Sequence, residues 1–322
     1  MAFVDRLDAE HREALAAVPD DLKDLSDIGA ARAREQEMRR VLASRAPAVT
    51  GVVVSDQLAP GPPGGPEVLV RMYRPDGAHD PTPVLCFMHG GGMVLGAVAG
   101  ADPICRSIVS DVGCVVASVE YRLAPEHPHP APIEDCYAGL TWLATHAADL
   151  GIDPARIAVG GRSAGGGLAA ALALLARDRT GPGIALQWLI FPMLDDRTTT
   201  HFTDRDTHPK VWNLAANTVA WHALLGDAVG SGAVSPYAAP ARADDLSGLP
   251  PAYIAVGEFD LFVGEDIAYA ARLVAAGVTT ELHVYPGAFH GSDTLVPNAP
   301  LSKRQTADGR SALRAALFPT AG

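Results

Sequence analysis

Short apolar runs alternate with segments of helical periodicity along most of the chain. Apolar runs bounded by turn residues are typical of buried strands, and apolar positions recurring every three to four residues are typical of helices. We therefore predict strands at residues 52–56, 67–75, 83–89, 114–121, 156–161, 185–193, 252–257 and 281–286. We predict helices between them at residues 101–111, 134–146, 164–178, 264–276 and 301–317. This alternation indicates an α/β fold whose mainly parallel sheet is covered by helices on both faces.

Two segments stand outside this alternation. Residues 5–46 carry charges at helical spacing, which predicts surface helices broken near Pro19 and Gly29. Residues 195–248 are rich in Asp, Thr, His and Pro and contain one predicted helix at 213–225. A connection of this length is typical of a lid over a site. We therefore expect a first cap segment, a first core part, a cap insertion and a second core part, at residues 1–48, 49–194, 195–248 and 249–322.

The composition describes a globular protein and limits its partners. The 322 residues are 48% hydrophobic and 19% charged, which suits a sizeable core and argues against disorder. The formal net charge of −12 argues against nucleic acid or an anionic membrane surface as a partner. The longest purely apolar stretch, residues 168–176, is too short to cross a membrane, and the N-terminal residues lack the apolar core of a signal peptide.

The cysteines indicate a reducing compartment. Cys86, Cys105, Cys114 and Cys136 fall within predicted strands and helices, and they lack the spacing of a zinc site. We expect them to be buried free thiols, which is the usual state of cysteine in a protein core. Together with the missing signal peptide, they predict a cytoplasmic protein without a bound metal.

The strongest candidate for chemistry is Ser163. It stands in the sequence Gly161-Arg162-Ser163-Ala164-Gly165, between a predicted strand and a predicted helix. In a G-x-S-x-G turn the strand ends abruptly, the serine projects outward, and the helix N-terminus behind it favours negative charge. The motif also arises by chance, and it is then an ordinary tight turn between strand and helix.

A glycine run supports the nucleophile interpretation. His89-Gly90-Gly91-Gly92 directly follows an apolar strand. Successive glycines allow backbone N–H groups to approach a substrate oxygen closely and to form an oxyanion hole. The alternatives are a flexible loop or a phosphate-binding turn, but the run lacks the G-x-x-x-x-G-K pattern of the latter.

A nucleophilic serine needs a base and an acid that orients the base. In this class of fold they follow the serine in the order acid then histidine, each in a loop after a strand. Asp260 and His290 occupy these positions, whereas Glu265 and Asp266 fall in the next helix and His283 falls inside a strand. The remaining histidines lie in loops, the N-terminal segment, the insertion or earlier elements. We therefore predict Asp260 as the acid and His290 as the base.

Four stretches resemble one known family, the bacterial hormone-sensitive-lipase-like (family IV) α/β-hydrolase esterases, and come closest to the heroin-esterase-like carboxylesterases. They are HGGG, YRLAPEHPHPAP, PARIAVGGRSAGGGLAAAL and YPGAFHG, at residues 89–92, 121–132, 154–172 and 285–291. The resemblance implies an α/β-hydrolase fold with a helical cap, hydrolysis of small-molecule esters of short acyl chains, and no cofactor. Residue by residue, it implies that the catalytic triad is Ser163, Asp260 and His290. It also implies that the oxyanion is bound by the backbone N–H groups of Gly91, Gly92 and Ala164.

Three positions depart from the family pattern. Arg162 precedes the nucleophile where an acidic or small residue is usual, and Ser292 stands where an aromatic residue is common. The family's Asp-Pro-Leu-x-Asp-Glu reads Asp-Leu-Phe-Val-Gly-Glu at residues 260–265. None of these departures removes a candidate catalytic group. We expect Arg162 to alter rate or selectivity and to leave the class of activity unchanged.

Other polar and aromatic residues receive subsidiary predictions. Met93, Phe202 and Trp212 are candidates for the acyl or alcohol pocket, while Trp188 and Phe191 are expected in the core. We expect Tyr121, Arg122 and Glu126 to support the loop beneath the site. Arg122 and Glu126 are expected to form a buried ion pair.

Alternatives to a carboxylesterase remain open. The same triad serves lactonases and amidases. The plant gibberellin receptor resembles this family and binds its hormone without hydrolysis, having lost the catalytic histidine, so the presence of His290 argues against such a role here. The predicted strand at 281–286 would lie at the sheet edge, where pairing across a two-fold axis would give a homodimer.

Overall fold

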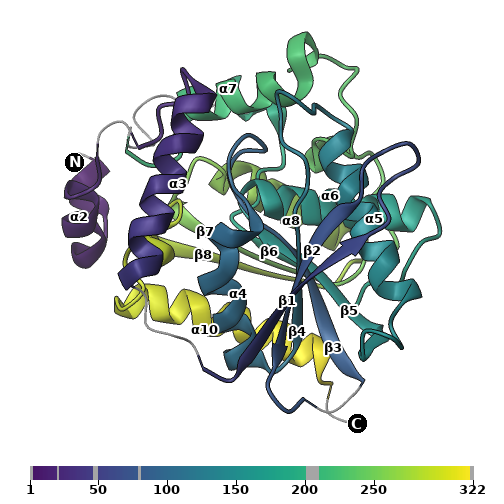
Figure 1. The fold of residues 1–322 in the computed structure, drawn as a ribbon. Coiled ribbons are helices and arrows are strands. Elements are labelled where there is room, and N and C mark those ends of the chain that lie inside the picture. Colours follow the sequence, from purple (N-terminus) through teal and green to yellow (C-terminus); the bar gives the residue numbers. More distant parts are fainter. Residues whose placement is uncertain (1–2, 20–21, 46–49, 79–80, 201–209, 320–322) are drawn as a thin grey trace.

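The centre of the molecule is one mainly parallel sheet. The computed structural model describes residues 3–19, 22–45, 50–78, 81–200 and 210–319, and within them eight strands follow the order β1-β2-β4-β3-β5-β6-β7-β8. Their bounds are β1 Val52–Ala59, β2 Val68–Pro75, β3 Thr82–Met88, β4 Val115–Val119, β5 Ile152–Arg162, β6 Leu186–Ile190, β7 Ala252–Phe259 and β8 Thr280–Phe289. The pairs β1–β2 and β2–β4 are antiparallel, and the remaining neighbours are parallel. The architecture predicted from the apolar pattern is confirmed (Figure 1).

Helices cover both faces of this sheet (Figure 1). They are α4 Val98–Val112, α5 Ala131–Thr145, α6 Ala164–Asp178, α8 Val263–Ala275 and α10 Pro300–Leu317. Buried side chains of α5, α6 and α8 belong to one hydrophobic cluster, and those of α4 and α10 belong to a second. Helix α6 is buried on all sides from Ala164 to Ala176, because its run of small and apolar residues lets neighbouring elements approach closely. This rigid helix begins directly after the candidate nucleophile.

The two remaining segments form helices that pack side chains into the hydrophobic core from outside the helical layers, among them Ala31, Trp221 and Leu224. The N-terminal segment contains α1 Phe3–Arg6, α2 Ala9–Ala16 and α3 Ile28–Arg45. The insertion after β6 contains η1 Asp196–Thr200, α7 Leu214–Leu225, η2 Gly226–Ala228 and η3 Pro240–Arg242, and the short α9 Ser292–Leu295 follows β8. In Figure 1, α3 and α7 lie outside the two layers of helices that cover the sheet.

The helix boundaries differ from the predicted ones where local hydrogen bonds decide them. The predicted break near Gly29 falls at Asp27, whose Oδ1 accepts a hydrogen bond from the N–H of Ala30 at 2.9 Å. Asp27 therefore caps α3 and leaves Gly29 inside the first helical turn. The helix predicted at 101–111 already begins at Val98, whose N–H donates to Oε2 of Glu120 at 2.6 Å.

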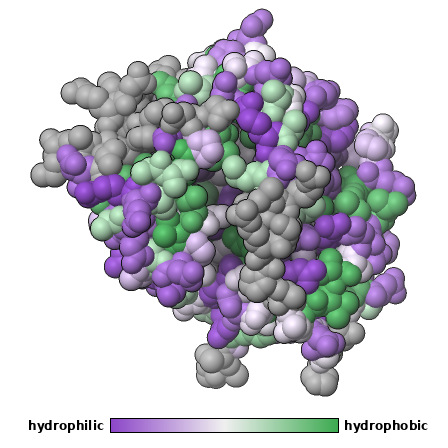
Figure 2. Space-filling view, turned by 60° about the vertical axis from the view of Figure 1, so that its left-hand side comes forward, coloured by the Kyte–Doolittle hydropathy of each residue, from purple (hydrophilic) through white to green (hydrophobic). Residues whose placement is uncertain are grey.

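Hydrophilic and hydrophobic residues are interspersed over the face drawn in Figure 2. The coloured residues do not form one continuous apolar surface there. None of the helices in the described part of the chain combines the length and the apolar character needed to cross a membrane. All four cysteines are buried and carry free thiols, as predicted.

Candidate active site

Ser163 lies at a strained turn between β5 and α6. Its backbone has φ 55° and ψ −123°, a positive φ that residues with side chains rarely adopt. The turn is fixed by hydrogen bonds from the Ser163 N–H to the Ile190 carbonyl (2.9 Å) and from the Met193 N–H to the Ser163 carbonyl (3.0 Å). A Cβ at Gly165 would collide with the carbonyl oxygen of His89, so this close approach requires glycine. The predicted nucleophile turn is therefore present, with Ser163 6% exposed.

Asp260 and His290 are in direct contact. Nδ1 of His290 lies 2.8 Å from Oδ2 of Asp260, and the other carboxylate oxygen accepts a hydrogen bond from the Phe262 N–H at 3.0 Å. Asp260 is 1% exposed. A proton on Nδ1 that is donated to Asp260 leaves Nε2 as the basic nitrogen of the ring. This pair has the geometry of an orienting acid and a general base.

Aromatic rings pack around the imidazole of His290. The ring centres of Phe191, Phe262 and Trp212 lie 4.6, 5.3 and 6.3 Å from its centre. These rings limit the imidazole to a small range of orientations. Phe191, expected as a core residue, is buried and also forms one wall of the site.

The parallel strands bring the three candidates to one edge of the sheet. Ser163 follows β5, Asp260 follows β7 and His290 follows β8, and β5 through β8 are neighbouring parallel strands. Their carboxyl ends therefore lie at the same edge, where ligands of open α/β sheets usually bind.

The glycine loop that follows β3 passes beside the nucleophile; we use this name for residues 89–96. A Cβ added at Gly90 would lie 3.4 Å from the Ser163 Cβ. Gly91 and Gly92 have positive φ values of 130° and 62°, and Met93 has a φ of 63° although it carries a side chain. Backbone N–H groups in such turns can converge on an anionic oxygen.

Trp212 closes the space between the glycine loop and the base. A Cβ at Gly92 would overlap the indole ring, which is 3% exposed and also neighbours His290. The indole N–H donates to Oδ1 of Asn217 at 3.1 Å, so the ring is held by the insertion. Trp212 therefore lies beside both His290 and the glycine loop, and Phe202, the other aromatic candidate for the pocket, lies outside the described residues.

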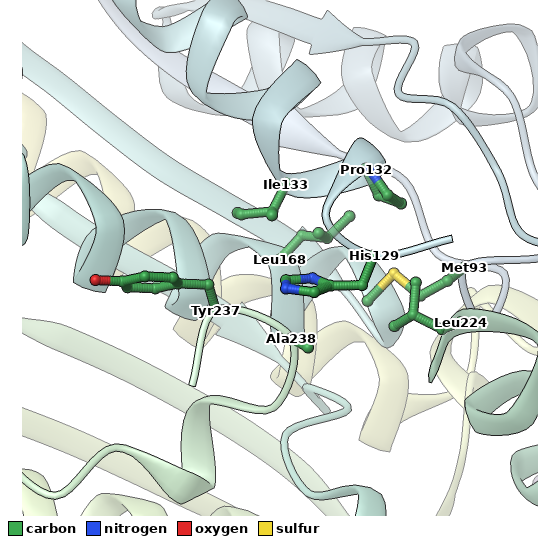
Figure 3. Close-up of a pocket in the computed structure, with 8 residues that line it drawn as sticks. All are labelled: Met93, His129, Pro132, Ile133, Leu168, Leu224, Tyr237 and Ala238. Carbon is green, nitrogen blue, oxygen red and sulfur yellow. The ribbon is translucent and has the colours of Figure 1, made fainter. Parts of the chain in front are cut away.

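Met93 of the glycine loop also lines a small cavity. Its lining comes from the glycine loop, the segment before α5, helices α5, α6 and α7 and the insertion (Figure 3), namely Met93, His129, Pro132, Ile133, Leu168, Leu224, Tyr237 and Ala238. The His129 imidazole lies among apolar side chains in this view. Burial lowers the pKa of His129, which favours the neutral ring in this apolar cavity.

The N-terminal helix α3 is hydrogen-bonded to the glycine loop. Nε of Arg32 donates to the carbonyl of Val94 at 2.8 Å, and the N–H of Gly96 donates to Oε2 of Glu35 at 3.0 Å. These contacts join residues more than sixty positions apart, and no local pattern in the sequence indicates them.

The scaffold beneath the loop differs from the predicted one in its ion pair. The Tyr121 hydroxyl donates to the first carbonyl of the glycine loop at 2.7 Å, as a scaffold residue should. Arg122 pairs with Asp135 through two side-chain hydrogen bonds of 2.7 and 2.8 Å, so the predicted Arg122–Glu126 pair is wrong. Asp135 is 1% exposed and offers a buried partner from α5, whereas Glu126 is largely exposed and pairs with Arg32 at 2.8 Å. Hydrogen bonding from Arg32 lowers the pKa of Glu126 to about 2.

Two further carboxyl groups lie buried behind Asp260 on α8. Glu265 accepts a hydrogen bond from the Leu194 N–H at 2.6 Å and shares another with Thr198, which fixes the start of the insertion. Burial raises the pKa of Glu265 and of Asp266 well above the usual range, which favours their neutral forms. Within the described residues, no group of three or more His, Cys, Asp or Glu side chains is placed to hold a metal ion.

Comparisons with known proteins identify the family of the chain. Residues 85–293 match a family model described as the alpha/beta hydrolase fold. The chain is 38% identical to Carboxylesterase NlhH of Mycobacterium tuberculosis over 262 residues, covering 78% of this chain and 79% of that protein. It is 37% identical to Esterase LipI of the same organism over 310 residues, covering 95% and 93%.

A solved structure described as Bacterial Heroin Esterase is similar over nearly the whole chain. It has a TM-score of 0.92 and 42% sequence identity, covering 98% of this chain and 99% of that one. The chain therefore belongs to the α/β-hydrolase fold family, within the hormone-sensitive-lipase-like group that its motifs resemble.

Proposed function

We propose that the protein is a serine carboxylesterase that hydrolyses short-chain acyl esters. The observation that carries this proposal is the 2.8 Å contact between His290 and Asp260 at the sheet edge where the strained turn presents Ser163. The names of its relatives, carboxylesterase and esterase, support the same class of reaction.

The proposed reaction has two acyl-transfer steps. His290 takes the hydroxyl proton of Ser163 as the serine oxygen attacks the ester carbonyl, and Asp260 stabilises the imidazolium that forms. The tetrahedral intermediate collapses to an acyl-enzyme as the alcohol leaves with the proton from His290. A water molecule, deprotonated by His290, then attacks the acyl carbon and releases the carboxylic acid and the free serine.

Backbone groups next to Ser163 supply the proposed oxyanion hole. The N–H groups of Gly91 and Gly92 belong to the loop beside the nucleophile, and the N–H of Ala164 opens helix α6. The first N–H groups of a helix have no partner within that helix and are available to an anion. Each such donor contributes about 3–4 kcal/mol to stabilisation of the transition state in related chemistry.

The segments 1–48 and 195–248 form the proposed cap, and it limits the acyl chain. Trp212 lies against Gly92 of the glycine loop, which supports a pocket with little room for a long acyl chain. We assign Met93, Trp212 and Phe202 to the substrate pocket, the last from the sequence alone.

Hydrolysis of p-nitrophenyl esters from acetate to decanoate tests the function. We expect the highest kcat/KM for acetate or butyrate and a loss of about 10⁴-fold or more in kcat for Ser163→Ala. Lactones and anilides measured at the same concentrations separate a carboxylesterase from a lactonase or an amidase. Unchanged turnover by Ser163→Ala, or failure of a fluorophosphonate to label wild-type Ser163, would overturn the proposal.

Two properties of the whole molecule are part of the proposal. Strand β8 is at the sheet edge and exposes Leu282 and Val284, which supports a homodimer formed by pairing of this strand. Light scattering that finds only monomer at micromolar concentration would exclude it. The free thiols support a cytoplasmic location, which fractionation of the source cells would test.

A further inference from the structure

Arg162 connects the strand that carries the nucleophile to the segment that carries the base. It is the last residue of β5, directly before Ser163. Its Nη2 lies 2.6 and 2.8 Å from the two carboxylate oxygens of Asp293 and 3.0 Å from the hydroxyl of Thr294. Asp293 follows His290 by three residues, so this ion pair joins the two halves of the candidate triad.

Arg162 also reaches the base through an aromatic ring. Its guanidinium lies 4.7 Å from the centre of the Phe191 ring, and Phe191 lies 4.6 Å from the centre of the His290 imidazole. Phe191 thus contacts both the cation and the imidazole. A shift of Arg162 would be transmitted to His290 both by this ring and by Asp293.

The ion pair is largely shielded from water. The side chains of Arg162 and Asp293 are 14% and 11% exposed. Burial alone would raise the pKa of Asp293, but the charge and hydrogen bonds of Arg162 outweigh it and hold that pKa below its usual value. The pair therefore stays ionised beside a histidine that becomes positively charged during the reaction. A buried pair contributes little to stability compared with apolar side chains of similar volume, so stability alone does not account for it.

We propose that Arg162 is a positioning residue for His290: it fixes residues 290–294 against β5 and neutralises the charge of Asp293 beside the imidazole. This inference rests on the proposed function, because it concerns the base of that reaction. It gives a role to the departure from the family pattern at this position.

The charges around His290 determine the sign of the expected effects. Asp260 contacts the imidazole directly, with Asp266 behind it, while Asp293 and Arg162 face it from α9 and β5, with Arg310 beyond Arg162. Without the charge of Arg162, Asp293 favours the imidazolium, so a higher pH is needed to form the neutral base. Without the charge of Asp293, Arg162 disfavours the imidazolium, and the neutral base persists to lower pH.

The test compares pH profiles of kcat/KM for wild type, Arg162→Met, Asp293→Asn and the double variant on p-nitrophenyl butyrate. The acid limb is the part of each profile in which kcat/KM rises with pH. We expect its midpoint to shift to higher pH by about 0.3–1 unit in Arg162→Met and to lower pH by a similar amount in Asp293→Asn. The double variant should return close to the wild-type midpoint. Loss of positioning should lower kcat about 10- to 100-fold in each single variant and change KM by less than about threefold.

Arg162→Lys is the conservative control. Lysine keeps the charge and one contact to Asp293, so we expect an unmoved acid limb and a kcat within about fivefold of wild type. It also serves if Arg162→Met does not fold, because a limb that moves upward in Arg162→Lys would contradict the inference. Acid limbs that move in the same direction in both single variants, or not at all, overturn this inference while the esterase activity stands. A wild-type protein that hydrolyses no ester overturns the proposed function itself, and this inference with it.

Discussion

The glycine loop and the segment around His290 meet at Ser163, but different parts of the chain hold them. Helix α3, a part of the N-terminal segment, donates to and accepts from the glycine loop through Arg32 and Glu35. The His290 segment is held by residues of the core, namely Asp260 and the Arg162–Asp293 pair. The proposed oxyanion donors thus depend on hydrogen bonds from α3, whereas Phe289, the residue before the proposed base, meets the N-terminal segment in a cluster of apolar side chains.

The two attachments also differ in burial. Asp260 is 1% exposed, and its contact with His290 is shielded by three aromatic rings. The Arg32 side chain is 31% exposed, and its ion pair with Glu126 contributes little by itself, because water screens such pairs. The importance of Arg32 lies in the main-chain carbonyls that it fixes. We therefore expect the oxyanion hole to be more sensitive than the base to loss of the hydrogen bonds made by Arg32.

The largest effect on activity is expected from Asp260→Asn, which changes the attachment of His290 to the core. Asparagine retains the shape of the acid but favours the wrong tautomer of His290 and cannot stabilise the imidazolium, so kcat should fall about 10⁴-fold. Asp266→Asn is the matched control, because Asp266 is equally buried and its neutral form is already favoured. Steady-state kinetics should find the control within about threefold of wild type. Equal losses in both variants would mean that disturbance of α8, and not loss of the acid, lowers the rate.

An intermediate effect is expected on the peripheral side, from Arg32→Ala. Without its hydrogen bond to Val94, the glycine loop should shift by a fraction of an ångström, which lowers kcat about 10- to 100-fold. Arg12→Ala is the control, since Arg12 belongs to the same segment but donates to the carbonyls of Asp5 and Leu7 within that segment. If both variants lose the same activity, the whole segment matters and the contrast between the two attachments fails.

The smallest effect concerns stability, in Glu265→Gln. Burial raises the pKa of Glu265, so the folded chain keeps a proton that the unfolded chain releases above about pH 4.3. The free energy of unfolding therefore falls as the pH rises from that value toward the raised pKa. Glutamine keeps an oxygen that accepts from the Leu194 N–H, and its amide N–H can donate to the Thr198 hydroxyl oxygen. It cannot ionise, so the Tm of the variant should depend less on pH between about 5 and 8. The exposed Glu67→Gln should keep the wild-type dependence, and a Glu265→Gln profile parallel to wild type would show that Glu265 is ionised.

Local patterns in the sequence were sufficient to predict the sheet and its covering helices and to select the candidate triad. The apolar run of β3 and the small residues of β5 and α6 specify their own structure. Asp260 and His290 could be identified because the topology requires them after particular strands. The prediction depended on chain order, which a sequence states directly.

The contacts that support the site could not be predicted in the same way. Arg122 and Glu126 are neighbours in sequence, yet Arg122 pairs with Asp135, because α5 places a buried carboxylate beside it. The contacts of Arg32 with Val94 and of Arg162 with Asp293 span 62 and 131 positions. Such pairs form only when whole helices and strands pack together. In the sequence, the arginines that make them look the same as arginines that are merely exposed at the surface.

The burial of every cysteine has a practical consequence. Cys86 lies within β3 and Cys114 directly precedes β4. Burial raises the pKa of each thiol to about 12, so almost no reactive thiolate forms at neutral pH. A single cysteine introduced on the exposed side of α7 would then react alone with a maleimide dye. The native chain is thus already suited to fluorescence studies that ask whether the insertion moves, without prior removal of its own thiols. The same four thiols, when they do react, report opening of the core itself.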